Sequence, residues 1–202
     1  MRVRIVAAVF AAALVAACAT SATNTLPQTK RDALRIDDIA LSFAPDAAIV
    51  WSDGMNDYKT SGIPDSPDTR RAFLAQKAAP HIQHALDEEI RPHFRGTDPA
   101  RLMITVRQLQ VPSGAMRVLF ASSYGLRAQI RLVDIRTGQT LLEAPEFNGV
   151  VTTQGGLIAY AIEQAFPNPI DRVSRAFSSA LMSWLQTGQA FASGTPGATL
   201  RR

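Results

Sequence analysis

Residues 126–132 alternate between apolar and polar side chains, and this alternation constrains the fold more than any other part of the chain. One side of the extended segment carries Leu126, Ala128, Ile130 and Leu132, and the other carries Arg127, Gln129 and Arg131. Such a strand is buried on one face only. A turn follows, in which Gly138 supplies the positive φ that a tight hairpin needs, and the return strand begins at residues 140–143. The pattern predicts an antiparallel meander with one solvated face.

The remaining elements follow from hydrophobic periodicity and from helix end signals. We expect further strands at 36–43, 102–111 and 147–152, a second short apolar piece at 48–51, and a bulge near Arg107 and Gln108. Residues 52–68 are rich in Asp, Gly, Pro, Ser and Asn and predict a long loop. One helix should run from about residue 67 to 94, kinked or split at Pro80.

The C-terminal part predicts a short helical piece at 157–166 and then a longer helix. Asn168 caps this helix, Pro169 occupies its first turn and Gly188 ends it. The fold class is therefore α+β: an antiparallel sheet with a long N-terminal helix and a C-terminal helix packed on one face.

The first residues indicate export. Arg2 and Arg4 precede an unbroken run of small and apolar residues from 5 to 17, and the only cysteine of the chain, Cys18, follows it. This run is too short to cross a bilayer and has the parts of a secretory signal. We expect a signal peptide at 1–17, a flexible tether at 18–33, one periplasmic domain at 34–188 and a disordered tail at 189–202. A lone cysteine leaves the domain no internal disulfide.

The end of this signal resembles the bacterial lipobox. Its residues are Leu14, Val15, Ala16, Ala17 and Cys18. The resemblance implies that Cys18 becomes the mature N-terminus and carries fatty acyl chains such as palmitate, which anchor the domain without a spanning helix. Ala19, in place of Asp, implies sorting to the periplasmic face of the outer membrane rather than to the inner membrane. The alternative is an ordinary signal cut after an Ala-x-Ala-like site.

Charge and motifs exclude several classes of function. Loss of Arg2 and Arg4 with the signal lowers the 21 Lys and Arg to 19 against 17 Asp and Glu, and no basic run remains for nucleic acid. His81, His84 and Glu88 have helical spacing suited to a metal, but they fall toward the solvated side of their helix. No Gly-x-Ser-x-Gly or Ser-x-x-Lys pattern is present. We therefore predict no enzyme activity, no cofactor and no metal.

Two features hint at a partner or ligand surface. Residues 115–120 include Met116, Leu119 and Phe120, which form either an additional core strand, our first expectation, or an exposed apolar lobe. Arg127 and Arg131 meet anionic groups or form the solvated face of the sheet.

The order of elements resembles small envelope lipoproteins of Gram-negative bacteria, including auxiliary lipoproteins of ABC-type transport systems. The lipobox, the strand and turn from Leu132 to Gly138 and the closing helix carry this likeness, and the long loop at 52–68 departs from it. It implies helices on one face of an antiparallel sheet and a non-enzymatic binding or accessory role in a transport or assembly system. A lipid or glycolipid carrier is the alternative. A continuous apolar cavity would favour the carrier, and a filled core with an exposed apolar edge would favour partner binding.

Overall fold

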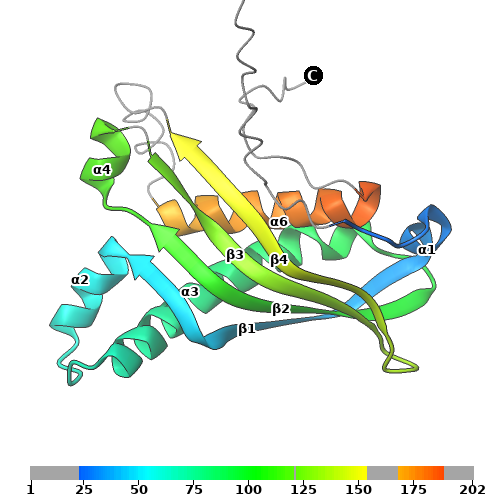
Figure 1. Ribbon diagram of the computed structural model, residues 1–202, viewed down its shortest axis with the longest axis horizontal. Coiled ribbons are helices and arrows are strands. Elements are labelled where there is room, and N and C mark those ends of the chain that lie inside the picture. The colour runs from blue at the N-terminus through cyan, green and yellow to red at the C-terminus, as the bar shows by residue number, and fades with distance from the viewer. Residues whose placement is uncertain (1–22, 121, 154–167, 189–202) are drawn as a thin grey trace, which may run out of the picture.

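The computed structural model describes residues 23–120, 122–153 and 168–188, and these form one sheet covered by helices. The four strands are β1 (Leu34–Trp51), β2 (Asp98–Val111), β3 (Ser122–Asp134) and β4 (Thr140–Thr153), in the spatial order β1-β2-β3-β4. The helices are α1 (Gln28–Ala33), α2 (Ser52–Thr60), α3 (Pro67–Glu89), the 3₁₀ helix η1 (Arg91–His93), α4 (Gly114–Leu119) and α6 (Pro169–Thr187). The predicted α+β class is confirmed (Figure 1).

The sheet is mixed, which corrects the expectation that it would be antiparallel throughout. The meander β2–β3–β4 is antiparallel as predicted, with the bulge between Val106 and Gln108, but β1 pairs with β2 in parallel. The reason is the crossover: α3, about 35 Å long at 1.5 Å per residue, returns the chain so that β2 starts beside the start of β1.

Three other expected boundaries are wrong. Segments 36–43 and 48–51 are one strand, β1, with a register shift between Phe43 and Ala48, and the two expected return strands are one strand, β4. Pro80 lies inside α3, which continues through it as one helix, so the expected split into two helices is wrong. The expected helix at 157–166 lies outside the described residues, as does the predicted tail at 189–202.

The predicted loop at 52–68 contains α2, because tertiary contacts hold it. Tyr58 is buried, its ring meets Phe73 of α3 edge-on at 5.4 Å, and its hydroxyl donates to the Pro64 carbonyl at 3.0 Å. The amino-acid composition of residues 52–68 does not reveal this packing, which outweighs their weak propensity for helix.

Local signals start both long helices and end α6, but α3 ends at Glu89 rather than near residue 94, because the 3₁₀ helix η1, which contains Pro92, follows it. Ser66 and Thr69 form a reciprocal capping box at the start of α3. The Asn168 side chain accepts from the Ile170 N–H at 3.2 Å, and Gly188 ends α6 in the left-handed conformation with φ 78°.

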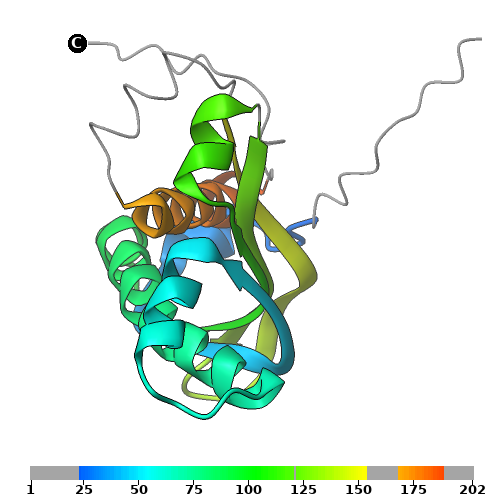
Figure 2. The same cartoon turned by 90° about the vertical axis from the view of Figure 1, so that its left-hand side faces the viewer.

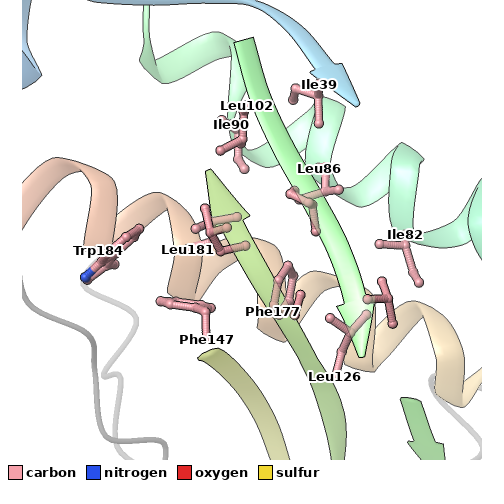
Figure 3. Packing of buried hydrophobic residues seen from close by; sticks show 14 of the residues in the cluster. Ile39, Ile82, Leu86, Ile90, Leu102, Leu126, Phe147, Phe177, Leu181 and Trp184 are labelled. Atoms are coloured by element: carbon pink, nitrogen blue, oxygen red, sulfur yellow. The ribbon is translucent and has the colours of Figure 1, made fainter. Parts of the chain in front are cut away.

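The core lies between the sheet and the pair α3 and α6, which contact each other and cover one face (Figure 2). Figure 3 shows Leu86 of α3 and Phe177 and Leu181 of α6 meeting Leu102 and Leu126 of the sheet. Leu86, Leu102, Phe177 and Leu181 have no exposed surface, and Leu126 has 2%. The interior is filled by interlocking side chains, the arrangement that stabilises a domain without disulfides.

Residues 24–33, within the segment predicted as a flexible tether at 18–33, pack against the domain. The buried Asn24 side chain donates to the Trp184 carbonyl of α6 at 2.8 Å and accepts from the Leu26 N–H at 2.9 Å. Leu26 joins the core, and α1 follows. The tether prediction is therefore wrong for residues 24–33, because an apolar side chain and a paired amide attach this segment to the end of α6.

Candidate functional site

Helix α4 and Phe120, the residue that follows it, present an exposed apolar surface made of Met116, Leu119 and Phe120, which we term the α4 surface. These side chains are 48%, 68% and 56% exposed. The first expectation for this segment, a core strand, is wrong; the alternative, an exposed apolar lobe, is confirmed. Ser113 begins the helix by accepting from the Met116 N–H at 3.4 Å, so the local sequence has a cap that ends the extended conformation.

Arg117 fixes α4 to the rest of the domain. Its side chain is 3% exposed, donates to the Pro112 carbonyl and lies 3.9 Å from the Asp53 carboxylate of α2. Because this arginine turns inward, the apolar residues on the other sides of the short helix face solvent. Sequence reasoning missed Arg117; the signal that would have found it is the Ser113-Gly114 cap, which places residues 116–120 in a helix rather than a strand.

Arg127 and Arg131 lie on the solvated face of the sheet and have partners there. Arg127 donates to Asn148 at 3.1 Å, and Arg131 lies 3.2 Å from Glu143. The hydrogen bond from Arg131, joined by one from Gln129, lowers the pKa of the Glu143 carboxyl. These contacts link β3 to β4, so the row of arginines forms cross-strand polar pairs on the solvent-exposed face of the sheet.

The two arginines lie at different distances along the sheet from α4. Arg131 pairs opposite Met103, in the first half of β2, and Arg127 pairs opposite Gln108, nearer the end of β2 that α4 follows. Of the five residues predicted as a partner or ligand surface, three are exposed apolar residues at α4, and the two arginines make polar contacts across β3 and β4.

The histidines of α3 are used in polar contacts with nearby carboxylates. His81 Nδ1 lies 2.7 Å from the Asp171 carboxylate and links α3 to α6, and His84 Nε2 lies 3.3 Å from Glu88 within α3. Within the described ranges, no three His, Cys, Asp or Glu side chains gather closely enough to hold a metal ion. His81 thus contacts the facing helix, whereas His84 and Glu88 contact each other within α3.

The predicted lipidation site, Cys18, and the lipobox residues Leu14, Val15, Ala16 and Ala17 lie outside the described residues. In the part of the chain that the structure describes, none of the helices combines the length and the apolar character needed to cross a membrane.

No family model matches this chain, and no curated protein matches it. Similar solved structures include a Caulobacter crescentus CB15 protein provisionally named a lipoprotein, with 17% identity over 55% of this chain and 82% of that one, at a TM-score of 0.37. Protein XCC0632 from Xanthomonas campestris is 11% identical over 77% and 85% of the two chains, at a TM-score of 0.39. Lipoprotein GNA1162 from Neisseria meningitidis is 18% identical over 67% and 99%, at a TM-score of 0.23.

Proposed function

We propose that this chain is a lipid-anchored envelope lipoprotein with a non-enzymatic role, which binds a partner protein through the α4 surface. Acyl chains on Cys18 would hold it at the periplasmic face of the outer membrane, the side that Ala19 favours. The observation that carries the proposal is the exposure of Met116, Leu119 and Phe120 on a domain whose core is filled. Contiguous apolar side chains left in water are typical of contact surfaces.

The filled interior favours partner binding over the alternative of a lipid carrier. A carrier needs a continuous apolar cavity large enough for an acyl chain. In the described part of the chain, the space between the sheet and the helices is instead occupied by fully buried side chains, including Ile104, Ile82 and Phe177.

The position of Asn24 favours a protein over the bilayer as the partner of α4. Cys18 precedes Asn24 by six positions (24 minus 18), so the chain between them spans at most about 22 Å. A lipid on Cys18 would therefore keep the α1 end of the domain near the membrane. Helix α4 lies at the opposite end of β2, whose 14 residues span about 45 Å (Figure 1). An upright domain would hold α4 out in the periplasm.

The resemblance of the lipobox and the strand and turn before Gly138 to auxiliary lipoproteins supports the finer part of the proposal, a partner within a transport or assembly system of the envelope.

Intact mass analysis of the membrane fraction tests the anchor. The wild type should have the mass of residues 18–202 plus acyl chains, and Cys18→Ala should lose both the acyl mass and the membrane association. An unacylated, soluble wild type would contradict the anchor and leave the α4 surface to be tested separately.

Site-specific photo-cross-linking in intact cells tests the α4 surface. A photoreactive residue at position 119 should give one discrete protein adduct, and the same residue at Lys30, at the other end of the sheet, should not. Phe120→Glu should abolish the adduct without changing the melting temperature, because Phe120 is exposed. An adduct formed with lipid, or one that survives Phe120→Glu, would refute a protein partner at α4.

A further inference from the structure

The first described residues lie at one end of the sheet. Strand β1 follows α1 and begins at Leu34, which pairs with the first residue of β2, Asp98, and β3 ends beside them at Asp134. The turn between β3 and β4 therefore shares this end of the domain with α1 (Figure 1). Cys18 precedes the buried Asn24 by six positions (24 minus 18), a reach of at most about 22 Å. A lipid on Cys18 would thus keep this end of the domain within reach of the bilayer.

The turn at this end carries an exposed apolar side chain, Ile135, which is 44% exposed. Hydrogen bonds fix the backbone around it. The Ile135 N–H donates to the Pro99 carbonyl at 3.1 Å, and the Asp134 carboxylate accepts from the N–H groups of Arg136 at 2.7 Å and Thr137 at 3.1 Å. Because the backbone of the turn is fixed, the Ile135 side chain stays on the outside of the domain.

Two exposed cations lie next to this turn and share one carboxylate. Lys30 Nζ of α1 lies 3.3 Å from Oδ2 of Asp98, and Arg136 Nη2 lies 3.7 Å from Oδ1 of the same residue. The shared contact places α1 and the turn side by side. The Lys30 and Arg136 side chains are 63% and 64% exposed, whereas that of Asp98 is 27% exposed. The two cations therefore extend farther into solvent than the carboxylate between them, and an anionic group that approaches this end meets them first.

An apolar side chain between exposed cations suits the surface of a bilayer. Proteins bind such a surface through apolar side chains that enter the boundary between head groups and acyl chains, and through Lys and Arg that meet lipid phosphates. Three side chains bind too weakly to recruit a free protein. A domain that is already anchored has a high effective concentration at the surface, so the same contacts are enough to set its orientation.

We propose that Lys30, Ile135 and Arg136, which we term the α1-end surface, rest on the bilayer that carries the Cys18 lipid. Ile135 enters the interfacial layer and the two cations contact lipid phosphates. The inference rests on the proposed anchor and adds an orientation to it: the domain stands on its α1 end, and α4, at the other end of β2, is held away from the lipid.

Tryptophan quenching on vesicles tests this orientation. The mature chain, residues 18–202, is coupled through its only cysteine, Cys18, to a maleimide lipid in vesicles of phosphatidylethanolamine and phosphatidylglycerol with brominated acyl chains. The tryptophan of Ile135→Trp should be quenched strongly, and that of the matched variant Leu119→Trp, at the exposed α4 surface, should not. The wild type gives the baseline, because its two tryptophans, Trp51 and Trp184, are buried.

Charge variants in the Ile135→Trp background test the role of the cations. Arg136→Gln and Lys30→Gln should each lower the ratio of docked to undocked domain about fivefold, the contribution of one cation at an anionic surface. Lys59→Gln removes an exposed lysine of α2, at the other end of β1, and should leave the ratio unchanged. Vesicles of phosphatidylcholine, which has no net charge, should give weaker quenching.

The contrary results are distinct from a failure of the anchor. An unquenched Ile135→Trp, equal quenching of Leu119→Trp, or a ratio that neither Arg136→Gln nor Lys30→Gln changes would overturn the α1-end surface. Chemical coupling takes the place of acylation in cells, so an unacylated wild type in the mass analysis would refute the anchor without altering the outcome on vesicles.

Discussion

Gly149 of β4 lies directly against the backbone of α6 at Phe177. A Cβ atom added there would lie 2.4 Å from the Phe177 Cα and 2.7 Å from the Phe177 Cβ. Carbon atoms in ordinary contact are about 3.5–4.0 Å apart, so Gly149→Ala requires α6 and β4 to separate by about 1 Å. The obstructing atoms belong to the helix backbone or are fixed by it, so a change of side-chain rotamer cannot relieve the clash.

The free-energy cost of Gly149→Ala follows from the contacts that the separation of α6 from β4 disturbs. Overpacking in a filled core costs about 1–3 kcal/mol. Phe177 also meets Phe147 edge-on with ring centroids 5.6 Å apart, a contact that contributes about 1 kcal/mol and weakens as α6 moves. The unfolded chain of the alanine variant has fewer accessible conformations, which offsets about 0.5 kcal/mol of this destabilisation. We expect Gly149→Ala to lower the free energy of unfolding by about 2 kcal/mol.

Urea unfolding of the Cys18→Ala chain, followed by far-ultraviolet circular dichroism, measures this change. Gly114→Ala is the matched control, because its Cβ would be 3.6 Å from the nearest atom, a side-chain nitrogen of Arg117, in ordinary contact. The control should leave the midpoint unchanged or raise it slightly. If Gly149→Ala behaves like Gly114→Ala, the close packing of β4 on α6 is not as described.

Three further outcomes are expected. Asn168→Ala removes the cap that accepts from the Ile170 N–H and should cost about 1 kcal/mol in the same urea assay, whereas Asn168→Asp should restore it. Asn24→Ala should speed proteolysis within residues 23–33 without unfolding the sheet, because the buried hydrogen bond of Asn24 to α6 is lost; unchanged cleavage would contradict this attachment. The N–H of Thr137 donates to Asp134 and lowers the pKa of that carboxyl below its ordinary value of 3.8. A carboxyl whose pKa is lower in the folded than in the unfolded chain stabilises the fold at pH values above its unfolded-state pKa. This contribution is lost as the pH falls through the folded-state pKa. Asp134→Asn should therefore flatten the loss of stability below about pH 4 in acid titrations.

Much of the candidate site could not be predicted from the sequence, for one reason. The apolar residues of α4 are plain in the sequence, but apolar character does not tell a core strand from an exposed helix. Their exposure depends on Arg117 reaching the Pro112 carbonyl and approaching Asp53, a residue 64 positions away (117 minus 53).

The sequence by itself determined the elements whose signals lie within a few neighbouring residues. The alternation at 126–132, the turn at Gly138 and the cap at Asn168 specify the hairpin and α6, because backbone geometry and local hydrogen bonds act over that range. Only the tertiary structure decided that β1 joins the sheet in parallel, that α2 is helical, that residues 24–33 are attached to α6 and that α4 faces solvent. Each of these depends on contacts between segments far apart in the chain. Burial of apolar surface is not directional, so the local sequence does not specify which segment an apolar residue packs against.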